Sequence, residues 1–155
     1  MSPTERWGLH ASALVTAVTG ALDGGLRWFG QRMGEFGPEP SPWLGQAQHA
    51  HVLAAPLLVF TLGVLVRGHL VPRLRGGASG RATGLALAAC LAPMVLSGYA
   101  IQVVVDPAWR TGWSWAHGVS ASLFLLAYFG HLAAGLLGRA AGARQPLAES
   151  RSLVP

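Results

Sequence analysis

The chain has 155 residues, enough for one domain, and its composition is that of a membrane protein. Hydrophobic residues make up 52% and charged residues 11%, whereas ordinary globular domains have about 25% charged residues. All eleven cationic residues behind the net charge of +5 are arginines scattered between apolar blocks, which argues against a nucleic-acid-binding protein. The single cysteine, Cys90, excludes an internal disulfide, a c-type haem attachment site and an iron–sulfur cluster.

Four apolar stretches are long enough to cross a hydrocarbon core of about 30 Å, which takes about 20 residues. They cover roughly residues 7–26, 47–66, 83–105 and 113–137. The first is the weakest because Asp23 lies near its end. A cleaved signal peptide is the competing interpretation of this stretch, and it is disfavoured because no cleavage site follows cleanly. Pro56 and Pro93 predict kinks in the second and third. We expect an all-α fold, an up-down-up-down four-helix bundle in the membrane, formed by residues 1–140 and followed by a polar tail, 141–155.

Tryptophans and arginines indicate the ends and the direction of these spans. All six tryptophans lie at span ends, as expected for aromatic belts at the two membrane interfaces. Eight arginines lie on the side of the two termini and the second connector, and three lie on the opposite side. The positive-inside rule therefore predicts a multi-pass protein with both termini in the cytoplasm. The expected location is a bacterial inner membrane.

Six histidines are present in this apolar chain, and ionisable side chains inside a span usually mark function. His117 and His131 are 14 residues apart, so both rings leave one face of the fourth helix, about 21 Å apart along its axis. Because successive spans alternate in direction, His10 shares a membrane level with His131. The start of the second span shares the other membrane level with His117. The histidine that meets His117 there is expected to be His51, with His49 as the alternative.

Two histidines that face each other across a helix bundle can bind a b-type haem on both axial faces. The pairs His10–His131 and His51–His117 therefore predict two haem b groups, with these four residues as iron ligands. His49 and His51 are about 200° apart on a helix, so at most one faces the core. For each histidine taken alone, an ordinary hydrogen bond between helices is the competing explanation.

His69 lies at the end of the second span, where an interfacial position is expected and a quinone site is the alternative. Glycines within the spans would let a flat macrocycle or a neighbouring helix approach closely. The glycines concerned are Gly20, Gly63, Gly98, Gly118 and Gly130.

An ordered set of short motifs extends over about residues 5 to 138. The motifs are Arg6-x3-His10, Thr19-Gly20, a histidine at the head of span two, Ser97-Gly98-Tyr99 and His117-x13-His131. This set resembles the four-helix di-haem cytochrome b superfamily, which includes cytochrome b561-type proteins and the cytochrome b subunits of formate dehydrogenase and nickel–iron hydrogenase.

This resemblance implies the same two ligand pairs and electron exchange between quinone or quinol and an extracytoplasmic redox protein. Such a partner would be a c-type cytochrome or a reductase or dehydrogenase subunit. It also implies a quinone site near the cytoplasmic haem. The candidates for quinone or haem-propionate contacts are His10, His69, Arg67, Arg139 and Arg6. The chain has short connectors and no fifth span, so its surface for docking a catalytic subunit is smaller than in the longer members.

The expected function is transmembrane electron transfer by a non-catalytic subunit of a quinone-linked oxidoreductase, in contact with membrane lipid. One alternative is a small histidine-containing transporter or proton relay, which would need further buried acidic residues, and the second to fourth spans contain none between their ends. Another is a structural membrane subunit without a cofactor.

Overall fold

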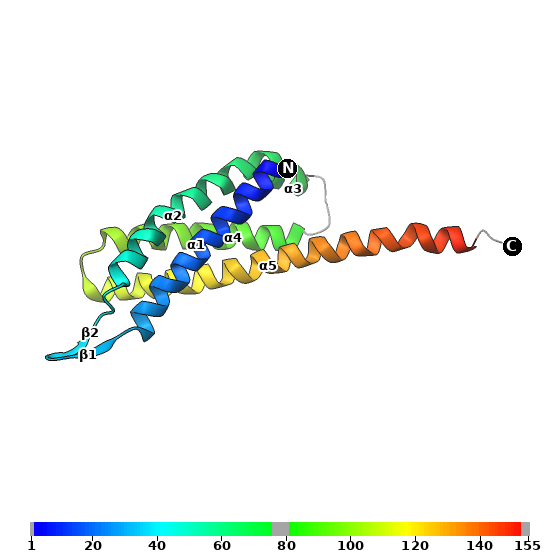
Figure 1. Ribbon diagram of the computed structural model, residues 1–155. Coiled ribbons are helices and arrows are strands. Elements are labelled where there is room, and N and C mark those ends of the chain that lie inside the picture. The colour runs from blue at the N-terminus through cyan, green and yellow to red at the C-terminus, as the bar shows by residue number, and fades with distance from the viewer. Residues whose placement is uncertain (1, 76–80, 153–155) are drawn as a thin grey trace. The chain divides into compact units, whose positions relative to one another are not determined.

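The computed structural model describes residues 2–75 and 81–152 and is helical apart from one short β-hairpin (Figure 1). The predicted all-α class is therefore confirmed. The chain forms two compact units, Met1–Gly76 and Gly77–Pro155, which are described separately. Each unit contains one pair of long antiparallel helices, α1 with α2 and α4 with α5.

Helix α1 spans Pro3–Phe29 and begins at a capping box. The Ser2 hydroxyl accepts the backbone N–H of Glu5 at 3.2 Å, and the Glu5 carboxylate accepts the backbone N–H of Ser2 at 2.7 Å. Near the other end, Arg27 pairs with Asp23 one turn earlier at 3.2 Å. Helix α1 continues through Asp23 and is longer than the predicted first span at both ends.

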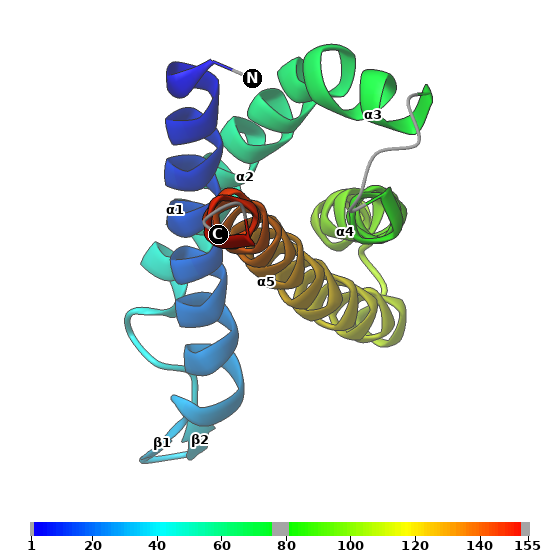
Figure 2. The same ribbon diagram turned by 90° about the vertical axis from the view of Figure 1, so that its right-hand side faces the viewer.

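A two-stranded antiparallel hairpin joins α1 to α2 and projects from their ends (Figures 1 and 2). Its strands are β1 (Arg32–Gly34) and β2 (Gly37–Glu39). Gly37 has φ of +123°, a conformation that side chains rarely adopt, so glycine suits the reversal of the chain. The glycine and proline content of this segment predicts a connector, but it does not predict the strands.

Helix α2 (Leu44–Leu65) continues through one π-helical turn, η1 (Val66–Leu70), into the short helix α3 (Val71–Arg75). Pro56 lies inside α2 without ending it. The π-helical turn contains His69. Such turns are rare in proteins and are frequent at functional sites.

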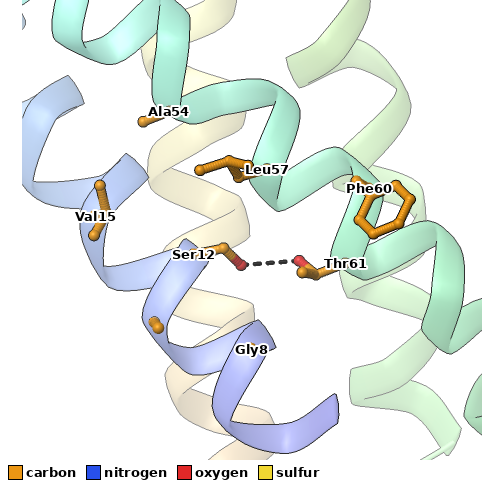
Figure 3. Close-up of a pocket in the computed structure, with 8 residues that line it drawn as sticks. Gly8, Ser12, Val15, Ala54, Leu57, Phe60 and Thr61 are labelled. Carbon is orange, nitrogen blue, oxygen red and sulfur yellow. Dashed lines mark hydrogen bonds between the residues drawn. The ribbon is translucent and has the colours of Figure 1, made fainter. Parts of the chain in front are cut away.

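Hydroxyl groups connect α1 to α2. Ser12 Oγ and Thr61 Oγ1 lie 2.8 Å apart (Figure 3), and Thr16 Oγ1 donates to the Ala54 carbonyl oxygen at 3.2 Å. In an apolar environment, one interhelical hydrogen bond contributes about 0.6 kcal/mol on average. These two contacts therefore help to fix the register of the pair.

The second unit consists of α4 (Arg81–Val103) and α5 (Pro107–Ser152). Asp106 caps α5, because its carboxylate accepts the backbone N–H of Trp109 at 2.9 Å. Pro93 lies inside α4 without ending it. Helix α5 continues well beyond the predicted fourth span, so residues 141–152 of the predicted polar tail are helical.

Three helices among the described residues are long and apolar enough to cross a membrane. The segments concerned are Leu44–Leu65, Ala82–Val103 and Pro107–Gly138. Helix α1, the weakest predicted span, is not one of them. Large apolar side chains are exposed on these helices, as at Leu53 (75%) and Leu126 (70%). Such exposed apolar surfaces are compatible with an integral membrane protein.

Candidate functional site

The ring of His117 is held against α4. Its Nδ1 lies 2.9 Å from the carbonyl oxygen of Met94 and 3.3 Å from Ser97 Oγ. A carbonyl oxygen can only accept a hydrogen bond, so Nδ1 of the neutral ring carries the proton. Because the Ser97 hydroxyl donates to the Pro93 carbonyl oxygen at 2.6 Å, it faces Nδ1 as an acceptor. In this tautomer, the lone pair of the neutral imidazole is on Nε2.

Gly98 makes room for this ring position. A Cβ atom at residue 98 would lie 3.2 Å from Cε1 and 3.4 Å from Nδ1 of His117. Gly98 is also one helical turn after Met94, so its lack of a side chain leaves space for the imidazole to reach the Met94 carbonyl oxygen. The ring position therefore depends on a small residue at 98.

Helix α4 also holds His131. The Nδ1 atom of His131 lies 2.9 Å from Thr83 Oγ1. The next residue is Gly84, where an added Cβ would lie 4.0 Å from His131 Cε1, an ordinary van der Waals distance. A hydroxyl can donate or accept, so this contact positions Nδ1 without determining where the ring proton lies.

The contacts on α4 have the same spacing as the histidines on α5. Thr83-Gly84 and Ser97-Gly98 are 14 residues apart, and so are His117 and His131. Because α4 and α5 run antiparallel (Figure 1), one register brings a hydroxyl–glycine dipeptide to both histidines.

The first unit contains the same arrangement once. The Nδ1 atom of His51 lies 3.3 Å from Thr19 Oγ1. A Cβ at Gly20 would lie 2.8 Å from His51 Cε1, closer than real Cβ contacts, so the ring occupies the space of a side chain. The Thr19 hydroxyl donates to the Val15 carbonyl oxygen at 2.8 Å, which favours an acceptor role toward Nδ1 and a proton on that nitrogen. In that tautomer, the lone pair of the neutral ring is again on Nε2.

The other histidines of the first unit are placed differently. His49 is exposed, whereas His51 is half-buried and faces α1. His10 is half-buried on α1, nine residues before Thr19. Nine residues correspond to about 900°, so His10 leaves α1 on the side opposite Thr19 and away from α2. His69 is half-buried in the π-helical turn.

The predicted contacts to quinone or propionate are described only in part. Arg6 is exposed near the start of α1. The side chains of Arg67 and Arg139 lie outside the described residues, although both positions are helical. Arg67 belongs to the same five-residue π-helical turn as His69.

Each predicted ligand pair, His10–His131 and His51–His117, takes one residue from each unit. Since the units are described separately, both pairings stay predictions. Within the described residues, no group of three or more His, Cys, Asp or Glu side chains could hold a bare metal ion. A haem iron with two axial imidazoles needs only two protein ligands.

The first unit also has two grooves. One has a volume of about 300 Å³ and lies beside the Ser12–Thr61 hydrogen bond, with Val15, Leu57 and Phe60 among its lining residues (Figure 3). The other, of about 420 Å³, is lined by Leu22, Leu26, Trp43, Gln46 and Ala47. Neither lining includes a histidine.

The hydroxyl–glycine partners of the histidines are not among the site residues predicted from the sequence. Gly20 and Gly98, which are expected to allow close approach of a macrocycle or a neighbouring helix, each lie against an imidazole of the other helix in their own unit. An added Cβ at Gly63, Gly118 or Gly130 would meet no atom of its own unit within 4 Å. The signal in the sequence was a Ser/Thr-Gly dipeptide recurring at the same interval as His117 and His131.

Comparison of the chain with protein-family models, with curated proteins and with solved structures finds no match to any of them.

Proposed function

We propose that this protein is a di-haem b-type cytochrome that transfers electrons across a membrane. It relays them between the quinone pool and an extracytoplasmic redox partner, as an electron-transfer subunit of a respiratory-type complex. The observation that carries the proposal is the pair His117 and His131, which lie on one helix with both Nδ1 atoms held by α4.

His51 and His117 fit the requirements of haem ligands. A ligating imidazole is neutral, binds iron through one nitrogen, and gives its other N–H to a protein acceptor that fixes the ring. His117 has such an acceptor in the Met94 carbonyl oxygen, and His51 has one in the Thr19 hydroxyl. In both rings the Nδ1 proton leaves the lone pair on Nε2, the nitrogen that would bind iron.

The proposed ligand pairs are those predicted from membrane depth, His10 with His131 and His51 with His117. When bound, haem supplies a reversible one-electron change at its iron. The chain's own contribution is to hold the four imidazoles at two levels, which His117 and His131 separate by about 21 Å along α5. The apolar helices would exclude water from both levels.

Four helices would cross the membrane. They are the three strongly apolar helices and α1, which contains the first predicted span. The arginine distribution supports cytoplasmic termini in a bacterial inner membrane. A quinone site would then lie near the cytoplasmic level, where the candidates are Arg6, Arg67, His69 and Arg139.

The test is the haem content of the full-length protein, purified in detergent from cells supplied with haem. We expect reduced b-type absorption bands and a pyridine haemochrome value of about two haems per chain. A colourless preparation would contradict the proposal and favour a transporter, a proton relay or a structural subunit. A value near one would contradict the two-centre arrangement.

A further inference from the structure

We propose that a recurring hydroxyl–glycine dipeptide is the positioning element for three histidines of this chain. Its hydroxyl faces Nδ1 of a histidine on the paired helix, and its glycine lies beside the ring, which a side chain at Gly20 or Gly98 would crowd. The three copies are Thr19-Gly20 for His51, Thr83-Gly84 for His131 and Ser97-Gly98 for His117. The role of this element in orienting iron ligands rests on the proposed function. The contacts themselves do not, because each of them lies within a single unit.

The copies share one geometry. The distances from hydroxyl oxygen to Nδ1 are 3.3, 2.9 and 3.3 Å in the order of the chain. In every copy the hydroxyl residue comes first, the glycine follows, and the histidine is half-buried on the other helix of the same pair.

The chain contains an internal comparison for this element. Thr111-Gly112 has the same residue types, but both residues are exposed. The Thr111 hydroxyl donates to the Pro107 carbonyl oxygen of its own helix, and a Cβ at Gly112 would meet nothing within 4 Å in its unit. Ser79-Gly80 lies outside the described residues. The residue types alone therefore do not bring the dipeptide into contact with a histidine. Its position between two paired helices is also needed.

The hydroxyl, unlike the glycine, should affect the redox potential of a haem that the histidine binds. An acceptor at Nδ1–H makes the imidazole a stronger electron donor through Nε2, which favours the ferric over the ferrous iron. Removing the acceptor should raise the midpoint potential of the haem concerned. His117 keeps the Met94 carbonyl oxygen at 2.9 Å when Ser97 is replaced, so Ser97→Ala should shift the potential only slightly.

The decisive variant is Thr19→Val, which keeps the shape of the side chain and removes its hydroxyl. The matched control is Thr16→Val on the same helix, because Thr16 donates to the Ala54 carbonyl of α2 and has no such role at a histidine. Thr83→Val tests the second unit independently, and Thr111→Val is its control. Thr19→Ser restores the hydroxyl and should restore the properties of the wild type.

With haem bound, potentiometric titration of the b-type bands should show one centre moved to higher potential in Thr19→Val and the other unchanged. Haem affinity at the affected centre should fall about tenfold, the lower end of the range for loss of such a partner. Thr16→Val should leave both potentials unchanged. Equal shifts in Thr19→Val and Thr16→Val would overturn the inference, because the hydroxyl would then serve helix packing only.

In the full-length protein without haem, nitrogen NMR of the side chains should show His51 and His117 with the proton on Nδ1. Thr19→Val should lower that population at His51, whereas Thr16→Val should not. Should the protein bind no haem, the proposed function fails, but this measurement still decides the positioning role. An unchanged tautomer in Thr19→Val would overturn it.

Discussion

The two helix pairs hold histidines in the same way but space them differently. In the second unit, His117 and His131 lie on a single helix, so their separation follows from the helical rise of α5. In the first unit, His10 belongs to α1 and His51 to α2, so their separation depends on how the two helices pack. The second unit should therefore tolerate changes in helix packing better than the first.

The largest effect is expected from removing a ligand of the second unit. His117→Ala and His131→Ala should each reduce the haem content from two to one per chain, because each removes one iron ligand of one pair. Pyridine haemochrome analysis measures this directly. His49→Ala is the control and should keep both haems, since His49 is exposed. Loss of haem in His49→Ala, with retention in His51→Ala, would transfer the ligand role to His49.

In the first unit, the most severe change is Gly20→Ala. The new Cβ would lie 2.8 Å from His51 Cε1, so the ring must move. Overpacking of this kind costs about 1–3 kcal/mol, and we expect a lower thermal unfolding temperature and weaker haem binding at the His51 centre. Gly24→Ala, one turn later on α1, meets nothing within 4 Å in its unit and should change neither property. Equal behaviour of the two variants would contradict the close approach at Gly20.

The second unit offers a graded version of the same experiment. Gly98→Ala would bring a Cβ to 3.2 Å from His117 Cε1, whereas Gly84→Ala would leave 4.0 Å to His131 Cε1. Redox titration should therefore show a moderate shift at one centre for Gly98→Ala and none for Gly84→Ala. A larger effect at Gly84 would mean that the ring of His131 lies closer to α4 than described here.

The smallest effect is expected from the Ser12–Thr61 hydrogen bond. Ser12→Ala or Thr61→Val should lower the free energy of unfolding by about 0.6 kcal/mol, the average for interhelical hydrogen bonds in membranes. A double-mutant cycle isolates the pairwise contribution. Both haems should be retained. A larger coupling energy, accompanied by a change in one midpoint potential, would show that α1–α2 packing controls the position of the histidines.

Much of the helical framework could be predicted from the sequence, because a long apolar run has few other stable structures. The β-hairpin could not, since its residues carry turn chemistry without strand periodicity. Helical geometry predicted that only one of His49 and His51 faces inward, and the structure turns His51 toward α1. The hydrogen-bond partners of the histidine Nδ1 atoms could not be predicted for another reason. They depend on the register between two helices, which the periodicity of each helix alone does not determine.

The close fit of His51 over Gly20 has a consequence for how this chain can vary. A larger residue at position 20 would crowd an imidazole at position 51, and a hydroxyl at position 19 lies within hydrogen-bond distance of Nδ1 of that imidazole. Two adjacent positions and a third one more than thirty residues away are thus coupled through one imidazole. Among descendants of a common ancestor, we expect them to be kept together or lost together.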